Sequence, residues 1–318
     1  MNNLKNSRIL ITGGAGLVGS HTCDLLLREL PDEIVIFDNF SRGTKKNIED
    51  ALVSGIVKVV EGDIGNYQLL EKSLKGIDYC FHLAAIRITE CAQDPKKCLE
   101  VLVDGTFNVA EACVKQGIKK IVAASSASVY GMAQEFPTDE MHHPYNNRTI
   151  YGASKVFNEN LLRSFNDMYK LDYIALRYFN IYGPRMDAHG KYTEVLIRWM
   201  ECIVRNEPPQ IFGDGLSSMD FVFVKDVARA NILAMKSQYS DKFFNIASGV
   251  ETNLNELLSE LLKVMGSSLE PVYRDERKVN PVRKRLASIR LAEKYLNFNA
   301  EHALDQGLRE LVEWWKKI

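Results

Sequence analysis

The feature that most constrains the fold is a short apolar run that leads directly into a glycine-rich turn and then into a helix-forming segment. Residues 9–12 read ILIT, and the sequence TGGAGLVGS begins at residue 12. Gly14, Gly16 and Gly19 satisfy a GxGxxG spacing, and Gly13, Gly16 and Gly19 satisfy the related GxxGxxG spacing. Such glycines let the chain turn tightly, bring backbone N–H groups against a pyrophosphate and allow the next helix to pack closely. The segment therefore predicts the first strand, turn and helix of a dinucleotide-binding unit.

This unit opens a regular alternation of apolar runs and amphipathic segments that extends to about residue 180. The apolar runs are RILIT, EIVIFD, VKVVEG, DYCFHLAA, KIVAASS and YIALRYF. Runs that are apolar throughout suit strands covered by helices on both faces. We expect an α/β fold with a doubly wound parallel sheet of the Rossmann type, followed by a smaller, discontinuous α/β lobe that binds substrate.

The regular alternation fades after Gly183, so the domain boundaries have to be inferred from later segments. MDFVFVKDVARANILAM and KFFNIAS read as a strand-to-helix segment and a strand that rejoin the first sheet. LNELLSELLKVM and ALDQGLRELVEWWKKI read as amphipathic helices on either side of the basic segment RKVNPVRKR. The predicted dinucleotide-binding domain is 1–180 plus about 212–247, and the predicted smaller lobe is about 181–211 plus 248–318.

Composition excludes several classes of protein. The 318 residues carry a formal net charge of −1, and no long run of one sign could track a nucleic-acid backbone. No apolar stretch approaches the ~20 residues of a membrane-spanning helix. The N-terminal segment MNNLKNSRILITGG lacks the long apolar region of a signal peptide, so we expect a cytoplasmic protein that binds neither nucleic acid nor membrane.

The six cysteines form no CxxC pair and lie mostly in apolar or helical stretches. Cysteine in such surroundings behaves as a small hydrophobic residue. We interpret them as buried thiols in preference to a zinc site or a redox pair, and we expect no metal.

Two acidic residues follow the next apolar runs. Asp38 ends EIVIFD, where a carboxylate can hold a ribose 2′-hydroxyl and would repel a 2′-phosphate, so NAD is favoured over NADP. Asp63 in EGDI follows the third run. It either reaches the adenine amino group or caps the following helix, and the sequence favours neither alternative.

The chemical residues fall in a second pair of segments. Tyr151 and Lys155 form YxxxK in a helix-forming segment, which puts the phenol and the ammonium on one helix face. A free phenol has a pKa near ~10, and a close ammonium together with a nicotinamide cation would lower it towards neutrality. Upstream, AASSASVYG ends a predicted strand at the sheet edge where doubly wound folds bind ligands, with Ser126 among its serines.

At this point the chain resembles the extended short-chain dehydrogenases/reductases, and within them the nucleotide-sugar epimerases and dehydratases, most of all the UDP-glucose 4-epimerases. The resemblance spans nearly the whole chain. It is carried by TGGAGLVGS, DNF, GDI, HLAA, SSASVYG, YGASK, RYFNIYGPR and GDGLSSMDFVFVKDVARA.

The resemblance implies a role for each matching position. The implied catalytic residues are Ser126 as hydroxyl donor, Tyr151 as base, and Lys155 as the partner that lowers the Tyr151 pKa. The implied NAD contacts are Gly13, Gly16, Leu17, Val18, Gly19, Asp38, Asn39, Asp63, Ile64, Leu83, Ala84, Ala85, Tyr151 and Lys155. The implied nucleotide-sugar contacts are Arg87, Ser126, Tyr151, Asn180, Phe212, Arg283 and Arg285.

Two positions beside Ser126 separate the reactions within this group. Dehydratases and decarboxylases of the family resemble one another in carrying an acid just before VYG, whereas this chain has Ala127 and Ser128. Elimination therefore lacks its base. We expect an NAD-dependent 4-epimerase of UDP-hexoses or UDP-hexuronates, which oxidises C4 and returns the hydride to the opposite face. The alternatives are a dehydratase or decarboxylase with an unusual base, a dehydrogenase, or a non-catalytic NAD-binding protein.

The substrate end departs from the family pattern at two positions. Met219 stands where many relatives have an arginine for the diphosphate, and Leu102 stands where they have a helix-bending asparagine. Arg283 or Arg285 could replace the missing charge, and Arg285 could instead contact a uronate carboxylate or the solvent. Phe212 either stacks on the nucleotide base or belongs to the core, and His82 is expected in the core. The resemblance also implies a homodimer built from the helices after Pro95 and from Tyr151 onwards, with LRSFNDMY at the interface or facing the sheet.

Overall fold

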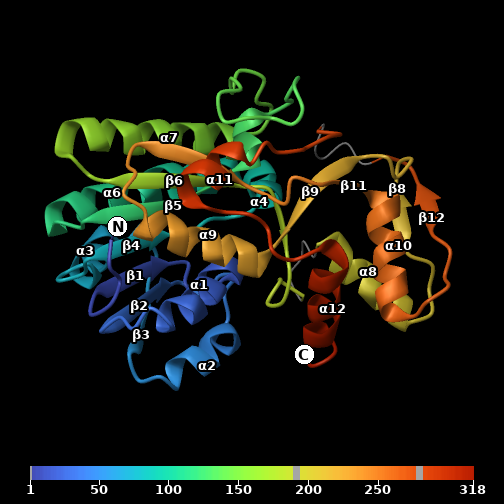
Figure 1. Ribbon diagram of the computed structural model, residues 1–318, viewed down its shortest axis with the longest axis horizontal. Helices are drawn as coiled ribbons and strands as arrows, with labels where there is room; N and C mark the ends of the chain where they lie inside the picture. The colour runs from blue at the N-terminus through green and yellow to red at the C-terminus, as the bar shows by residue number, and fades with distance from the viewer. Residues whose placement is uncertain (1, 189–193, 277–281) are drawn as a thin grey trace.

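A seven-stranded parallel sheet forms the centre of the larger part of the molecule (Figure 1). The structure, a computed structural model, describes residues 2–188, 194–276 and 282–318. The strand order is β10-β6-β5-β4-β1-β2-β3, so the chain reverses its direction of travel across the sheet between β1 and β4. The strands are β1 (Arg8–Thr12), β2 (Glu33–Asp38), β3 (Val57–Glu61), β4 (Tyr79–His82), β5 (Lys120–Ser126), β6 (Tyr173–Tyr178) and β10 (Lys242–Ile246). The predicted Rossmann-type sheet is confirmed.

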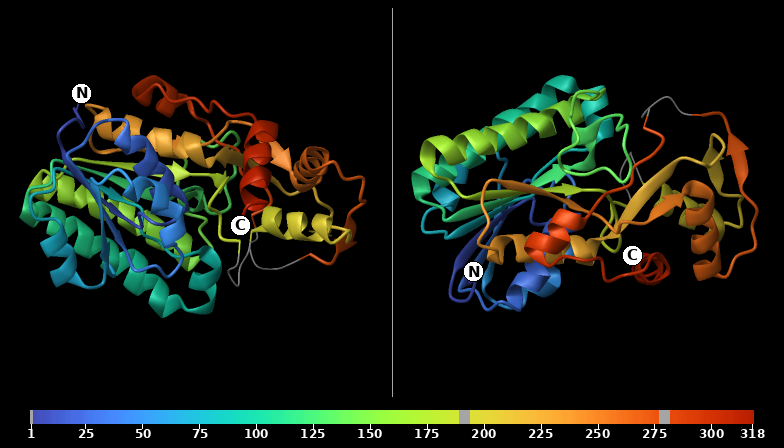
Figure 2. Two further views of the ribbon diagram at one scale, coloured as in Figure 1. Left: turned by 90° about the horizontal axis from the view of Figure 1, so that it is seen from below. Right: turned by 45° about the horizontal axis from the view of Figure 1, so that its top comes forward.

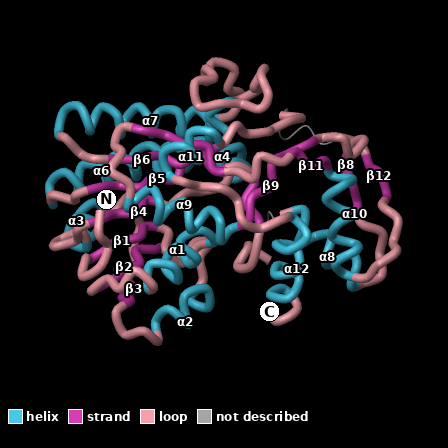
Figure 3. Tube along the Cα trace, viewed as in Figure 1, coloured by secondary structure: helices cyan, strands magenta, loops and turns pink. Residues whose placement is uncertain are grey.

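Helices cover both faces of this sheet, which is why its strands are apolar throughout (Figure 3). Ile9 and Ile11 of β1 belong to one hydrophobic core, while Leu10 between them belongs to the core on the other face. The covering helices and short turns are α1 (Leu17–Leu27), η1 (Lys45–Ile48), α2 (Glu49–Leu52), α3 (Tyr67–Ser73), α4 (Ile88–Gln93), α5 (Pro95–Leu99), η2 (Glu100–Asp104), α6 (Gly105–Gln116), η3 (Ala127–Tyr130), α7 (Ile150–Tyr169), α9 (Val224–Lys236) and α11 (Arg290–Leu296).

The remaining elements form a smaller lobe beside the carboxyl edge of the sheet (Figure 2). They are β7 (Asn180–Tyr182), α8 (Val195–Val204), β8 (Gln210–Phe212), β9 (Ser218–Phe223), β11 (Glu251–Asn253), α10 (Leu254–Met265), β12 (Val272–Arg274) and α12 (Leu304–Trp315). The apolar faces of α8, α10 and α12 meet in one core that includes Trp199, Leu257 and Leu308. The lobe is thus discontinuous in sequence, as expected.

The structure differs from the predicted domain boundaries at two segments. β9 does not join the large sheet but pairs with β7 and β11, and its alternating burial is that of a strand with one covered face. α11 lies against the large sheet, because Ala292 and Leu296 share a core with Phe244 of β10. Part of the basic segment RKVNPVRKR, residues 277–281, lies outside the described residues. Within the described ranges, no helix is long and apolar enough to cross a bilayer.

The interpretation of all six cysteines as free thiols was wrong for one pair. Cys91 of α4 and Cys98 of α5 form a disulfide, with their Cα atoms 4.8 Å apart. A continuous helix would separate them by about 10 Å. The chain instead breaks at Asp94, whose side chain accepts a hydrogen bond from the Lys97 N–H of the new helix. Cys23, Cys80, Cys113 and Cys202 are free, and the first three are buried as expected.

Candidate active site

A cleft runs along the carboxyl edge of the large sheet and into the smaller lobe. The residues that line it come from the turns after β1, β2, β4 and β5, from the start of α7, and from α8, β7, β8 and β9. This edge includes the point between β1 and β4 where the strand order reverses. Doubly wound sheets bind ligands at that point, because the loops on its two sides diverge and leave a crevice.

Two glycines of the first turn lie so close to other backbone groups that a side chain would not fit. Gly13 has a φ of +68°, and a Cβ on it would lie 2.7 Å from the Ala84 nitrogen. A Cβ on Gly19 would overlap the Gly13 carbonyl oxygen, because the start of α1 packs directly onto the turn. Gly13, Gly16 and Gly19 also line the cleft at the start of α1. These observations fit a pyrophosphate against the N-terminus of α1.

Asp38 is positioned by backbone groups on both sides of the cleft floor. Its Oδ2 accepts a hydrogen bond from Ala15 N at 2.9 Å, and its Oδ1 accepts one from Phe40 N at 2.8 Å. Burial raises the pKa of this carboxyl, and the two N–H groups oppose that shift. The side chain is thus held rigidly at the end of β2, where a ribose hydroxyl could reach its remaining lone pairs.

The alternative of Asp63 as a helix cap is wrong. Asn66 caps α3 instead, by accepting a hydrogen bond from Leu69 N at 3.2 Å. Asp63 accepts hydrogen bonds from Gly65 N at 2.8 Å and from Asn39 Nδ2 at 2.6 Å, and it lines the cleft together with Asn39 and Ile64. The two polar side chains therefore form one polar rim beside the glycine turn.

The segment after β4 is attached to the glycine turn by a residue that the sequence did not single out. Thr12 Oγ1 accepts hydrogen bonds from the N–H groups of Leu83 and Ala84 at 3.2 and 3.3 Å. The same hydroxyl lies 2.9 Å from Nδ1 of His82, which is buried as predicted. Burial lowers the pKa of His82 to about 3, so the ring is neutral. Leu83, Ala84 and Ala85 line the cleft opposite Gly13.

The predicted Ser126, Tyr151 and Lys155 come together at the edge of β5. Ser126 ends that strand, and its side chain opposes the rise in the pKa of the Tyr151 phenol. Thr149 caps α7 by accepting a hydrogen bond from Gly152 N at 3.1 Å. A Cβ on Gly152 would lie 2.6 Å from the Ser128 carbonyl oxygen, so only glycine allows α7 to start this close to η3, the turn that follows β5. That approach brings the phenol to the serine.

The charges around Tyr151 differ from the expectation in one respect. Burial raises the pKa of Tyr151, and the groups that oppose the shift are Ser126, Arg42 and Arg285. Lys155 is not among them, because its ammonium donates to the Ala124 carbonyl at 2.7 Å and lies 5.8 Å from the centre of the Tyr151 ring. Burial lowers the pKa of Lys155 to about 8. The lysine therefore interacts with the ring face and the strand rather than with the hydroxyl.

A buried ion pair between β6 and α7 helps to hold Ser126, Tyr151 and Lys155 in place. Arg177 of β6 donates to both carboxylate oxygens of Glu159 on α7, at 2.8 and 2.6 Å. Glu159 also accepts a hydrogen bond from Ser125 at 2.6 Å. The pair thereby connects β5, β6 and α7, the three elements that carry or adjoin the reacting groups. Its members lie far apart in the sequence and match no local motif, so sequence reasoning missed it.

The residues predicted at the substrate end divide into two groups. Asn180, Phe212 and Arg285 line the cleft, as does Met219. Phe212 does so while the preceding Ile211 is buried in the lobe core, which favours the stacking alternative over the core alternative. Arg283 is exposed, pairs with Glu276 at 3.2 Å and does not line the cleft, so its assignment to the substrate was wrong.

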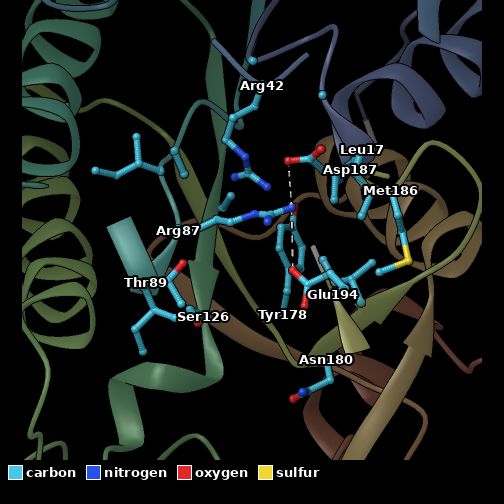
Figure 4. A pocket seen from close by; sticks show the side chains of 18 of the residues that line it. Leu17, Arg42, Arg87, Thr89, Ser126, Tyr178, Asn180, Met186, Asp187 and Glu194 are labelled. Atoms are coloured by element: carbon cyan, nitrogen blue, oxygen red, sulfur yellow. Dashed lines mark ion pairs between the residues drawn. The ribbon is translucent and has the colours of Figure 1, made fainter. Parts of the chain in front are cut away.

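Arg87 connects the two lobes across the cleft (Figure 4). Its guanidinium lies 3.3 Å from Asp187 and 3.8 Å from Glu194. Arg42 points into the same space, and its charge interacts with that of Arg87 and of the nearby acids. Sequence reasoning missed Arg42, Asp187 and Glu194. The only local signal was the position of Arg42 four residues after Asp38.

The substitution of Leu102 for the helix-bending asparagine leaves the bend in place. Residues Glu100–Asp104 form a π-helical turn. The Thr106 hydroxyl donates to the Leu102 carbonyl at 2.6 Å within this irregular stretch, and the leucine side chain is buried beside the disulfide. Apolar packing therefore occupies the place where relatives have an amide.

The comparisons agree with this geometry. The NAD dependent epimerase/dehydratase family matches residues 9–247. The UDP-glucose 4-epimerase of Mycolicibacterium smegmatis is 34% identical over 317 residues, covering 97% of this chain and 98% of that protein. A UDP-N-acetylglucosamine 4-epimerase from Methanobrevibacter ruminantium, solved with UDP-N-acetylmuramic acid, has a TM-score of 0.92 at 34% identity and covers 98% of this chain and 99% of its own.

A third similarity extends to a relative that acts on an acidic sugar. The UDP-glucuronic acid 4-epimerase of Bacillus cereus, solved with UDP-glucuronic acid and NAD, has a TM-score of 0.88 at 27% identity and covers 98% of this chain and 99% of that one. The family match spans Gly13, Gly16 and Gly19, which together we call the glycine cradle. It also spans Ser126, Tyr151 and Lys155. The chain belongs to the NAD-dependent epimerase/dehydratase family.

Proposed function

We propose that this protein is an NAD-dependent 4-epimerase of nucleotide sugars. The observation that carries the proposal is the meeting of Ser126, Tyr151 and Lys155 in the cleft, across from the glycine cradle and with no acid at positions 127 and 128. This set suits reversible oxidation of an alcohol. It lacks the carboxylate that proton abstraction from carbon requires.

The site residues fit NAD. Gly13, Gly16 and Gly19 would hold the pyrophosphate, Asp38 the adenosine ribose, and Tyr151 with Lys155 the nicotinamide ribose, in line with the resemblance. NAD supplies, when bound, the acceptor and the donor of the hydride that leaves C4 and returns to it. Because the same cofactor serves both halves of the reaction, the cycle needs no external oxidant.

The chain's own residues handle the proton. Burial raises the pKa of the Tyr151 phenol, and the positive charge of bound NAD would lower it again. Tyr151 would then accept the proton of the C4 hydroxyl as the C4–H bond breaks and the C4–O bond becomes a carbonyl. Ser126 donates a hydrogen bond to that oxygen as charge develops on it. After the 4-keto sugar turns over in the cleft, Tyr151 returns the proton to the oxygen while the opposite face of C4 is reduced.

The smaller lobe would bind the nucleotide diphosphate, for which UDP is our proposal. Phe212, the last residue of β8, presents an aromatic side chain to the cleft. Trp199 Nε1 donates to the Gln210 carbonyl at 2.8 Å, which fixes the strand that carries Phe212. Aromatic stacking and cations are the usual means of binding a base and its phosphates.

We also infer a homodimer through α6 and α7. Phe107 on α6 and Phe157 on α7 are 42% and 47% exposed, so both helices present aromatic side chains at the surface. Within LRSFNDMY, Leu162 and Phe165 face the sheet and Met168 is exposed. Light scattering of the wild type and of Phe157→Glu tests this inference. A monomeric wild type would contradict it.

The experiment for the function is product analysis without added cofactor. Purified protein is incubated separately with UDP-glucose, UDP-N-acetylglucosamine and UDP-glucuronate, and the sugar protons are followed by NMR. We expect a galacto-configured product from at least one of them. Accumulation of NADH, loss of water or loss of CO2 would point to a dehydrogenase, dehydratase or decarboxylase instead. If all three sugars stay unchanged even with NAD, the proposed function is wrong for the common UDP-sugars.

A further inference from the structure

Four buried polar side chains that the proposed mechanism does not use are joined by hydrogen bonds. Thr12, His82, Thr106 and Asn158 are between 0% and 7% exposed. His82 Nδ1 lies 2.9 Å from Thr12 Oγ1, and His82 Nε2 lies 3.0 Å from Thr106 Oγ1. Asn158 Nδ2 lies 3.1 Å from the same Thr106 oxygen. These contacts, which we call the buried chain, connect the end of β1, the end of β4, α6 and α7.

The hydrogen-bond pattern assigns every proton of the buried chain. Thr12 Oγ1 accepts the two backbone N–H groups that follow His82, so its own hydrogen points to His82 Nδ1. The ring of His82 is neutral, so its one N–H is on Nε2 and donates to Thr106. Thr106 donates its own hydrogen to the Leu102 carbonyl at 2.6 Å. Its oxygen can therefore only accept from Asn158, and the amide NH2 must face it.

One end of the buried chain belongs to the helix of the reacting groups. Asn158 lies three residues after Lys155 and seven after Tyr151, so the three side chains project from one side of α7. The positive charge of Lys155 contributes, after burial, to the lowered pKa of His82. The buried chain thus passes close to the ammonium that lies beside the Tyr151 ring.

The other end of the buried chain belongs to the wall of the cofactor site. Thr12 accepts the N–H groups of Leu83 and Ala84, and both residues line the cleft. A Cβ on Gly13 would lie 2.7 Å from the Ala84 nitrogen, so this segment packs directly on the glycine cradle. A dinucleotide in the cleft would extend from the glycine cradle to Tyr151. The buried chain therefore connects the two ends of that site through the interior.

The amide of Asn158 does not favour stability at this position. Its Oδ1 is buried and has no hydrogen-bond partner among the described residues. An unpaired carbonyl in the interior costs free energy, which an apolar side chain would avoid. Without the amide, Thr106 would still accept from His82 and donate to Leu102. Because no other group would lose its only partner, the stability of the fold does not account for Asn158.

We propose that Asn158 is a positioning residue of the reaction, which fixes α7, and with it Tyr151 and Lys155, relative to the glycine cradle. The inference rests on the proposed function and adds a residue to it. A buried polar network with assigned protons favours one arrangement of the segments that it joins. Hydride and proton transfer require reacting atoms at defined distances, so a shift of α7 lowers turnover more than it lowers substrate binding.

The first test removes the amide in Asn158→Leu, which keeps the branched shape of the side chain. With the UDP-sugar that product analysis shows to be converted, we expect kcat to fall about 10-fold, while KM changes less than about twofold. The Tm should stay the same or rise. Asn160→Leu is the matched control, since Asn160 is exposed on the same helix and donates to the Val156 carbonyl at 2.9 Å. An unchanged kcat would overturn the inference.

A second test asks whether Asn158 acts through Thr106, and it decides the case in which kcat and Tm fall together. Asn158→Leu is introduced into Thr106→Val, which lacks the hydroxyl, and into Thr106→Ser, which keeps it. We expect a further loss of kcat of less than about twofold in the first background and about 10-fold in the second. Equal losses in both would overturn the inference. Asn158→Ala repeats both tests with a smaller side chain, in case leucine overfills the site.

A third test needs no turnover. ADP carries a diphosphate for the glycine cradle but no nicotinamide ribose that could reach Tyr151 or Lys155. At saturating ADP, confirmed by calorimetry, we expect slower hydrogen exchange at the start of α7 in the wild type but not in Asn158→Leu. Equal protection in both proteins, or none in the wild type, would overturn the inference. If no UDP-sugar is epimerised, the proposed function fails, and this test still decides whether Asn158 couples α7 to the glycine cradle.

Discussion

The two halves of the cleft are built in different ways. The half under the glycine turn consists mostly of backbone, because Gly13, Gly19 and the segment after β4 approach one another at distances that exclude side chains. The half towards the smaller lobe consists of side chains such as Arg87, Phe212 and Arg285, which come from separate segments. The first half can recognise what many nucleotides share, and the second can distinguish one sugar from another.

Removal of the Tyr151 hydroxyl should have the largest effect, because it should lower turnover without changing NAD binding. In Tyr151→Phe we expect turnover to fall about 1000-fold, because the proton acceptor is lost while the ring still packs against Lys155. The NAD content of the purified protein should stay at the wild-type level. Turnover near that of the wild type would remove Tyr151 from the mechanism.

A side chain in the glycine cradle should damage the cofactor half. In Gly19→Ala the new Cβ overlaps the Gly13 carbonyl, so we expect loss of bound NAD and a decrease of about 1–3 kcal/mol in the free energy of unfolding. Gly16→Ala is the control for stability, since its Cβ would lie 3.3 Å from the same oxygen. Thermal unfolding and NAD absorbance measure the two effects. An equal decrease in the free energy of unfolding in the two variants would contradict the packing argument.

The disulfide joins α4 and α5, which both contribute residues to the lining of the cleft, and it should stabilise this region. Cys98→Ser opens a short loop, for which chain entropy predicts a loss of about 2 kcal/mol. Cys202→Ser, at a free and half-buried thiol, is the matched control. We expect reductant to lower the Tm of the wild type and of Cys202→Ser but not that of Cys98→Ser. Insensitivity of all three proteins to reductant would show that the disulfide does not form in solution.

The pH dependence should be the smallest effect. Lys155 has a pKa lowered to about 8, so its ammonium is present below pH 8 and is lost above it. If the ammonium holds the cofactor ribose, kcat/KM should fall about 10-fold for each pH unit above 8, as for any single ionisation. Lys155→Arg keeps its charge over this range, so its profile should lack that decline. A decline of the same steepness in both proteins would assign it to another group.

The comparison also explains which expectations held. The strands, the glycine turn and the meeting of Ser126 with Tyr151 follow from short-range patterns: apolar runs, glycine spacing, and a helix that begins at a capped, glycine-containing turn. The expectations that were wrong concern the partners of individual side chains, such as the Cys91–Cys98 bond and the Arg283–Glu276 pair. Arg283 and Arg285 are two residues apart in one extended segment, and only the positions of Glu276 and Ala127 send one side chain outwards and the other into the cleft.

The sequence alone thus determined the sheet, the dinucleotide cradle and the reacting residues, because each depends on backbone geometry within a few residues or on one strand end. Only the tertiary structure decided the Cys91–Cys98 bond, the return of α11 to the large sheet, the pairing of β9 in the small one and the partners of each cation. The disulfide depends on the break between α4 and α5 at Asp94, and the other features depend on which segments meet across the fold. Burial makes an unpartnered charge costly, so the segments that pack around each buried cation decide its partner.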